Sequence, residues 1–400
     1  MRILQANDPA EIKEIMREIR VDRYGINIMC PKAIGYLLKM NSVSNITANI
    51  LKQQMLSLGG DVAVSRGSLT GRRSKTDCLL IGSLSQLNQL GQKLKIQPFG
   101  LKNVARDLSR LLDNYQKEEF VIQLPRQRLV LRKGRCYIMG VLNLTPDSFS
   151  GDGLYGAAQE EIIRRAEEMA GDGADIIDIG GESSQPGAKR VSLKEELRRV
   201  IPVVKALDRK IKVPLSIDTC KPEVAKAAFD CGAQIVNDIT GLRDPLMRKA
   251  VSRYNAAAVI MHMKGSPRTM QKNPQYLSLI DEILKYFEEA LIRSADAGIN
   301  RERIIIDPGL GFGKTAEHNL EILKNLKDFK VLGRPILAGP SRKSFIGKIL
   351  HTDPGERVFG TVAACVLAAD NGAKIVRVHD VKEVSQALSV WQTIKQAGIC

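Results

Sequence analysis

Acidic and amide side chains recur at one kind of position in the second part of this 400-residue chain, directly after a short apolar run. Asp218 follows the run VPLSI, Asn237 lies in QIVND, and Asp307 ends RIIID. A carboxylate accepts two parallel hydrogen bonds, so these side chains suit a ligand ring that carries amidine-like N–H donors. Brought together in one buried place, the three residues would bind such a ring.

Hydrogen-bond donors occupy the same kind of position after other apolar runs. Asn143, Arg377 and His379 would offer donors to an anionic group, and the planar guanidinium of arginine suits phosphate in particular. The turn SRKS contains Lys343 and Ser344 and opens a helix-like segment, where backbone amides and the helix dipole favour an anion. The sequence thus predicts a ring-binding part and an anion-binding part of one site.

Eight short apolar runs predict the strands that must position these residues. Continuous apolar runs are typical of parallel strands buried on both faces, and segments of helical length separate them. Eight strand–helix units predict an α/β fold, a closed (β/α)8 TIM barrel. An open doubly wound sheet is the alternative, but it rarely needs eight consecutive repeats of this regularity. The runs lie at 137–144, 174–180, 213–217, 234–238, 257–262, 303–307, 334–339 and 375–379.

The polar residues recur at the same end of each predicted strand, which supports a functional interpretation of this barrel. Active sites in such barrels are built from the loops at the carboxyl ends of the strands, and the residues named above lie at those ends. Any one of them could be a hydrogen-bonded core group or a helix cap. Polar residues at eight strand ends in phase are hard to explain in that way, so we expect an enzyme site.

The first part of the chain is harder to interpret. Helical patterns at 9–20 and 101–117 and strand-like runs at 61–64 and 77–82 predict a small α+β domain over residues 1–125, followed by the barrel over 126–400. The segment SRGSLTGRRSK (65–75) is rich in glycine, serine and basic residues. Its arginines and backbone amides could contact a phosphate or an RNA backbone, but a solvated surface loop is the better interpretation. The sequence does not assign a function to this domain.

Composition excludes several classes of protein. The net charge of +16 could indicate nucleic-acid binding, but basic and acidic residues are interspersed, and aromatic residues make up only 4%. The sequence contains no apolar stretch long enough to span a bilayer, and the N-terminus lacks the pattern of a secretory signal. None of the seven cysteines forms a C-x-x-C pair, and the four histidines are scattered, which argues against a zinc site. We therefore expect a cytoplasmic protein without a membrane or nucleic-acid partner.

Six motifs between about residues 136 and 396 resemble those of the dihydropteroate synthases, in the order found in that family. They are MGVLNLTPDSFS, DIGGES, SIDT, DPGLGFGK, SRKSFIG and RVHD. The resemblance implies a (β/α)8 barrel, commonly a homodimer, that uses Mg2+. It also implies the reaction: p-aminobenzoate attacks 6-hydroxymethyl-7,8-dihydropterin pyrophosphate, giving 7,8-dihydropteroate and pyrophosphate for folate biosynthesis.

The resemblance also implies roles for individual residues. Asp218, Asn237, Asp307 and Lys343 would hold the pterin ring. Asn143, Arg377 and His379 would hold the pyrophosphate, with Asn143 also contacting the magnesium ion, and Ser344 would receive the p-aminobenzoate carboxylate. The loops 144–153 and 182–187 would close over the site. From these loops Thr145, Asp147, Phe149, Ser184 and Pro186 would contact the substrates.

One position departs from the family pattern. Many members carry Thr-Arg-Pro-Gly in the second loop, whereas this chain has Ser184-Gln185-Pro186-Gly187. Gln185 removes a cation, for which Lys189 or Arg190 could compensate. The alternative function is a pterin-dependent methyltransferase, which transfers a methyl group from methyltetrahydrofolate to a corrinoid protein. Such an enzyme would share the pterin-binding acids but would not need SRKS and RVHD, which are present here.

Overall fold

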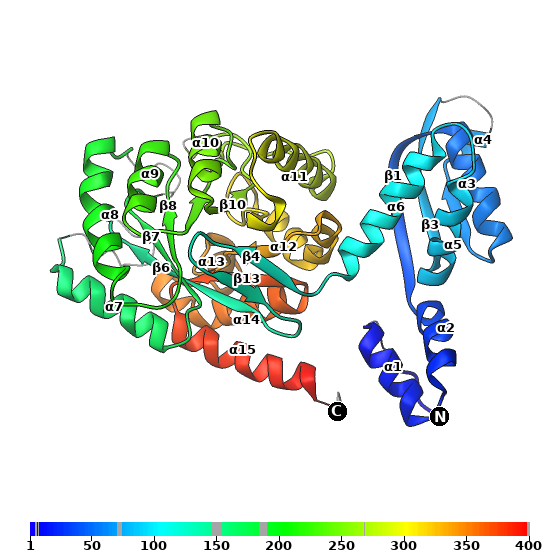
Figure 1. Ribbon diagram of the computed structural model, residues 1–400, viewed down its shortest axis with the longest axis horizontal. Helices are drawn as coiled ribbons and strands as arrows, with labels where there is room; N and C mark the ends of the chain where they lie inside the picture. The colour runs from blue at the N-terminus through cyan, green and yellow to red at the C-terminus, as the bar shows by residue number, and fades with distance from the viewer. Residues whose placement is uncertain are drawn as a thin grey trace. The chain divides into compact units, whose positions relative to one another are not determined.

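The computed structural model describes residues 1–397, except 5, 7, 70–73, 146–153, 155, 184–189 and 268. The chain forms two compact units, Met1–Asp113 and Asn114–Gln396, and each contains its own hydrophobic core. Figure 1 shows the N-terminal unit in blue to cyan and the larger unit from teal through green to red. The larger unit contains every polar position that the sequence marked as a site.

Eight parallel strands of the larger unit close into a barrel, and each strand pairs with its neighbours in chain order. The predicted (β/α)8 fold is therefore confirmed, and the open doubly wound alternative is wrong. All eight predicted strand positions are found, within one or two residues at their ends. The strands are β6 (Tyr137–Asn143), β7 (Ile176–Gly180), β8 (Leu215–Asp218), β9 (Ile235–Asp238), β10 (Ala257–Met261), β11 (Ile304–Asp307), β12 (Ile336–Ala338) and β13 (Ala373–Val378).

Helices surround this barrel and cover its outer face. Their starts are specified locally: Ser192 caps one helix by accepting the backbone N–H of Glu195, and Asp244 caps another that begins with Pro245. The helices are α7 (Gln159–Gly171), α8 (Leu193–Leu207), α9 (Pro222–Asp230), α10 (Pro245–Tyr254), α11 (Leu279–Asp296), α12 (Ala316–Lys324), α13 (Ser344–Leu350), α14 (Val358–Asp370) and α15 (Val381–Gln396). Three short 3-10 helices are η1 (Arg301–Arg303), η2 (Leu326–Leu332) and η3 (Pro354–Glu356).

Both faces of the barrel strands are buried, which explains why the strand sequences are apolar runs without alternation. In β7, Ile177 and Ile179 belong to the core between the barrel and its helices. Ile176 points the other way, into a second core within the barrel. Because successive side chains alternate across a strand, Asp178 faces the interior with Ile176.

A two-stranded hairpin fills the amino end of the barrel. It consists of β4 (Phe120–Gln123) and β5 (Arg128–Leu131), and it contributes Phe120, Ile122, Leu124 and Leu131 to the inner apolar core. Along the chain, the boundary between the two units falls between Asp113 and Asn114, whereas the sequence predicted it after residue 125. The hairpin belongs to the barrel because its apolar side chains are buried only there.

The N-terminal unit is an α+β fold, as predicted. Its antiparallel sheet has the order β1-β3-β2, and Leu51, Met55, Leu87, Leu90 and Leu112 from the helices pack in its core. The sequence indicated β2, β3, α1 and α6 but did not indicate the others. The elements are α1 (Pro9–Glu18), α2 (Arg23–Ala33), β1 (Gly35–Ser44), α3 (Asn45–Ser57), β2 (Asp61–Val64), α4 (Arg66–Leu69), β3 (Lys75–Ser83), α5 (Leu84–Leu94) and α6 (Leu101–Gln116).

Among the described residues, no helix is both long enough and apolar enough to cross a membrane.

Candidate active site

A cavity of about 370 Å3 opens at the carboxyl ends of the barrel strands. This volume lies in the range of small-molecule sites, which run from about 300 to 1,000 Å3. Strand register brings its polar floor together, because Asn143, Gly180, Asp218 and Asn237 are consecutive partners on four neighbouring strands. Gly180 keeps this layer open: a Cβ there would lie 3.5 Å from the Asn143 amide oxygen and 3.6 Å from the Asp218 Cβ.

Arg377 is the centre of a buried ionic network beneath the cavity. Its Nε donates to Asp178 Oδ2 at 2.7 Å, and its Nη2 donates to Asp218 Oδ2 at 2.8 Å. Asn237 Nδ2 donates to the same Asp178 oxygen at 2.9 Å. Burial lowers the pKa of Arg377, but the two carboxylates more than compensate and raise it above the usual value. Two of the three guanidinium nitrogens are thus held by acids of the floor.

Asp218 differs from an ordinary aspartate. Burial raises its pKa to about 7, although the Arg377 guanidinium opposes this rise and Asp178 adds to it. Protonation near neutrality therefore controls how many hydrogen bonds this carboxyl can accept from a ligand. A carboxyl poised in this way, inside a cavity, is typical of functional sites.

Asp307, at the end of β11, and Lys343, after β12, line another side of the cavity. Asp307 Oδ1 accepts the Gly309 N–H at 2.7 Å, and burial raises the pKa of its carboxyl. Burial lowers the pKa of Lys343 to about 8, and its Nζ lies 4.3 Å from the centre of the Phe312 ring. A Cβ on Gly311 would lie 3.1 Å from the Lys343 side chain, so glycine at this position leaves room for it.

His379 and Arg342 lie on the side of the cavity formed after β12 and β13. His379 Nδ1 is 2.9 Å from Ser341 Oγ, and burial together with nearby cations lowers the pKa of the imidazole to about 3. The ring is consequently neutral at pH 7 and offers an N–H rather than a charge. Arg342 has a positive φ of 54° and is held by Asp380, which fixes this turn at the cost of backbone strain.

The structure brings most of the predicted site residues together. The same cavity is lined by eight of them: Asn143, Thr145, Asp218, Asp307, Lys343, Ser344, Arg377 and His379. Asn237 lies just below it and orients Asp178. Asp147, Phe149, Ser184 and Pro186, together with Gln185, lie outside the described residues.

Two further acids at the site were not named as site residues from the sequence, although Glu182 belongs to the predicted loop 182–187. Asp178 is fully buried in the barrel interior, and its Oδ1 has no hydrogen-bond partner among the described residues. Glu182 lines the cavity. The signal for Asp178 was visible in the sequence, since it interrupts the apolar run ADIIDIG, where a charge needs a buried partner. Its partner Arg377 is distant in sequence, so that pairing could not be predicted from local pattern.

A polar cavity with paired acids and cations, at the carboxyl end of a (β/α)8 barrel, is typical of an enzyme that binds a small polar ligand. Comparison with known proteins specifies the class: residues 139–379 match the model of the pterin binding enzymes. The dihydropteroate synthase of Synechocystis sp. is 48% identical over 64% of this chain and 89% of its own length. The solved dihydropteroate synthase of Burkholderia cenocepacia, in complex with 7,8-dihydropteroate, is 44% identical, with a TM-score of 0.63 over 70% of this chain and 97% of its own.

A third relative extends the similarity beyond the barrel. A probable bifunctional folylpolyglutamate synthase/dihydropteroate synthase of Halobacterium salinarum is 40% identical over 96% of this chain. That match takes up 46% of the Halobacterium protein and must include most of the N-terminal unit. The chain belongs to the dihydropteroate synthase family of pterin binding enzymes.

Proposed function

We propose that this chain catalyses the condensation of 6-hydroxymethyl-7,8-dihydropterin pyrophosphate with p-aminobenzoate, giving 7,8-dihydropteroate and pyrophosphate. The observation that supports this most is the cavity in which Asp218, Asp307 and Lys343 converge. These groups complement the donor and acceptor edge of a pterin, which has N–H groups on one side and a carbonyl oxygen beside them.

In this proposal the acids and the lysine bind and orient the pterin. Asp218 and Asp307 accept its N–H groups, and Lys343 donates to its carbonyl oxygen or ring nitrogen. Asn237 acts through Asp178, whose position it helps to fix. The ordered network beneath the ring provides fixed dipoles and charges before the substrate arrives, which is the main source of stabilisation in such sites.

The chemistry then requires positioning more than proton transfer. The amine nitrogen of p-aminobenzoate forms a bond to the pterin methylene carbon, the carbon–oxygen bond to pyrophosphate breaks, and pyrophosphate departs with the electron pair. The amine loses its proton to solvent or to the departing pyrophosphate. Arg377 and neutral His379 donate to the phosphate oxygens, and Ser344 at the start of α13 receives the p-aminobenzoate carboxylate. Thr145, Asp147, Phe149, Ser184 and Pro186 complete the contacts.

Magnesium is part of the proposal and would be held by Asn143. The described residues contain no group of three or more His, Cys, Asp or Glu side chains that could hold a metal ion. One amide oxygen suits Mg2+ only if the substrate phosphates and water supply the other ligands, as is common for this ion. When bound in this way, the ion would stabilise the charge on the leaving pyrophosphate.

A homodimer is also proposed, through the helices that follow β12 and β13. Phe359 and Leu367 of α14 are 83% and 58% exposed, and Ile349 of α13 and Ile394 of α15 are exposed as well. These helices pack against one another, so their exposed apolar side chains lie on neighbouring elements. Light scattering should give twice the mass of the chain, and Phe359→Glu should shift the equilibrium toward monomer. A cytoplasmic location stays a prediction of the sequence, to be tested by cell fractionation.

The decisive experiment is a pyrophosphate-release assay with omissions. The purified chain should release pyrophosphate only with the dihydropterin pyrophosphate, p-aminobenzoate and Mg2+ all present, and should form 7,8-dihydropteroate in equal amount. Release without p-aminobenzoate, or release without dihydropteroate, would contradict the proposal. Methyltetrahydrofolate and a corrinoid acceptor, tested in the same way, should give no methyl transfer.

A further inference from the structure

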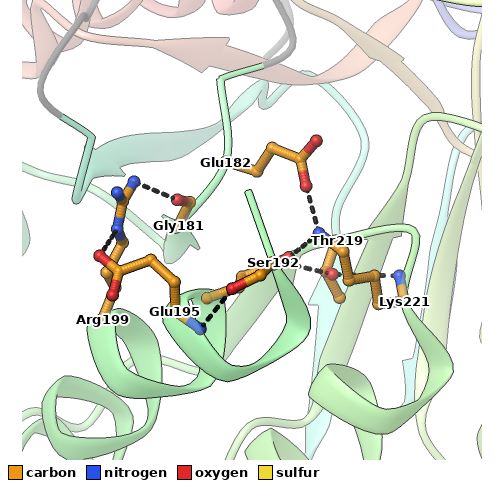
Figure 2. A network of polar contacts seen from close by, with 8 residues as sticks. Gly181, Glu182, Ser192, Glu195, Arg199, Thr219 and Lys221 are labelled. Atoms are coloured by element: carbon orange, nitrogen blue, oxygen red, sulfur yellow. Dashed lines mark hydrogen bonds and ion pairs between the residues drawn. The ribbon is translucent and has the colours of Figure 1, made fainter. Parts of the chain in front are cut away.

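The strongest feature outside the assigned site is a network of charges behind one wall of the cavity (Figure 2). The wall is the short segment Gly181–Ser183 that follows β7, in which Glu182 and Ser183 line the cavity. Lys221, which precedes α9, binds Glu182 through its Nζ and also binds Glu196 of α8. No residue of this network apart from Glu182 touches the cavity.

The backbone of this wall is fixed independently of Lys221. Arg199 Nη1 donates to the Gly181 carbonyl at 3.0 Å, while its Nε donates to Glu195 at 2.8 Å. Gly181 packs closely on α8: a Cβ there would lie 2.6 Å from a Val200 methyl carbon. Removing the Lys221 ammonium would therefore free the Glu182 side chain and leave the Gly181 backbone in place.

Lys221 is built to stay charged. Burial lowers its pKa, but the hydrogen bonds to Glu182 and Glu196 outweigh this and raise the pKa above its usual value. Glu196 is nearly inaccessible to solvent, with 1% of its side chain exposed, and also accepts the Thr219 hydroxyl at 2.6 Å. One cation thus neutralises part of the charge of two acids, and one of these acids lines the cavity.

The ion pair between Lys221 and Glu182 is important because of the charges that line the cavity. Glu182, Asp218 and Asp307 all line it, and under the function proposed above it must admit a substrate that carries a pyrophosphate. Asp218 is compensated by Arg377, and Asp307 lies near Lys343. Glu182 has Lys221 as its cation. A like charge left uncompensated beside the pyrophosphate would repel it.

We propose that Lys221 is a positioning residue that neutralises and orients the Glu182 carboxylate at the cavity wall, so that the wall admits an anionic substrate. The inference rests on the proposed function because it concerns the pyrophosphate part of the substrate. In this arrangement the second acid, Glu196, holds the Lys221 ammonium in place, and the Lys221–Glu182 pair determines specificity for an anionic substrate. Its link to the pterin part of the cavity is indirect, because Glu196 is one of the charges that raise the pKa of Asp218.

Binding measurements test this without relying on turnover. Inorganic pyrophosphate, titrated calorimetrically into protein with Mg2+ and 6-hydroxymethylpterin, should bind Lys221→Met about tenfold more weakly than wild type, a loss expected for one uncompensated charge nearby. Affinity for 6-hydroxymethylpterin alone should change less than the pyrophosphate affinity, because Lys221 reaches the pterin-binding acids only indirectly, through the effect of Glu196 on Asp218. Lys221→Arg should restore most of the pyrophosphate affinity.

Double variants separate charge from structure. Glu182→Gln combined with Lys221→Met should regain the pyrophosphate affinity, because the repelling charge is gone. Glu196→Gln combined with Lys221→Met should regain thermal stability, because no buried acid is left unpaired, but its pyrophosphate binding should stay weak. Lys330→Met is the matched control, since Lys330 binds Glu118 in a similarly shielded pair outside the cavity. It should leave both affinities unchanged.

Three results would overturn the inference: Lys221→Met binding pyrophosphate as wild type does, Lys330→Met losing as much affinity, or the Glu182→Gln double variant failing to regain it. A wild-type chain that bound neither pyrophosphate nor pterin would instead contradict the proposed function. The wild-type titration therefore distinguishes failure of the function from failure of the inference.

Discussion

At the amino end of the barrel the interior is filled by the apolar side chains of the β4–β5 hairpin packed on Met139, Ile176 and Val259. At the carboxyl end the barrel strands enclose Asp178, Asp218 and Arg377 in an ionic network. Buried ions are costly to desolvate, whereas buried apolar side chains stabilise the fold by about 1.5–3 kcal/mol each. The comparison indicates that packing at the amino end stabilises the barrel, whereas the residues at the carboxyl end serve binding and catalysis.

The largest effect should come from removing the cation at the carboxyl end. Arg377→Met leaves two buried acids uncompensated, so it should lower kcat/KM at least about a hundredfold and the free energy of unfolding by about 3–5 kcal/mol. Steady-state kinetics and denaturant unfolding measure the two effects. The control is Lys374→Met on the same strand, whose lysine pairs with Glu118 at the amino end and should matter only for stability. Equal losses of activity in both variants would contradict the division between the two ends.

Replacing an acid while keeping its shape should lower activity without unfolding the barrel. Asp307→Asn can still accept the Gly309 N–H but loses the charged acceptor that is proposed to face the pterin, so turnover should fall at least about tenfold. Asp175→Asn is the matched control, since Asp175 accepts the Ile138 N–H at 2.9 Å at the opposite end. Its turnover should equal that of wild type, and unchanged kinetics in Asp307→Asn would remove the role assigned to that residue.

Two truncations test where the barrel unit begins. Deleting residues 1–113 keeps the hairpin and should leave a folded barrel, whereas deleting 1–125 removes β4 and exposes the inner core. Thermal unfolding should show the longer deletion melting lower by about 10 °C, since three buried apolar side chains are lost. Equal melting temperatures would mean that the hairpin does not stabilise the amino end.

Shortening a single buried side chain of the hairpin should also lower stability, by less than the truncation does. Ile122 is fully buried, so Ile122→Ala should lower the free energy of unfolding by about 2–5 kcal/mol through lost burial and the cavity left behind. Its kcat at a temperature well below melting should match wild type. A large loss of kcat would show that packing at the amino end is transmitted to the site.

The sequence predicted the barrel because its information is local: eight continuous apolar runs, each followed by polar residues at the strand end. It predicted the cavity residues for the same reason, since parallel strands place their carboxyl ends together. The pairing of Asp178 with Arg377 could not be predicted, because it joins positions 199 residues apart. The hairpin was missed because its strands, β4 and β5, are only four residues each and look like a linker.

The smallest expected effect is a change of pterin affinity with pH, which depends on Asp218 at the carboxyl end. Asp218 has a pKa raised to about 7, so as the pH falls below that value the carboxyl becomes neutral and loses acceptor capacity for the pterin N–H groups. Affinity for 6-hydroxymethylpterin should therefore weaken toward about tenfold per pH unit below this point, as a group that must be ionised requires. Calorimetric titrations at pH values from about 5 to about 8, on both sides of this pKa, would measure it. Asp218→Asn should bind weakly at every pH with a flatter profile, because an amide does not titrate. If wild type and Asp218→Asn gave parallel profiles, another group would control binding, and the poised carboxyl would be a structural feature of the carboxyl end rather than a functional one.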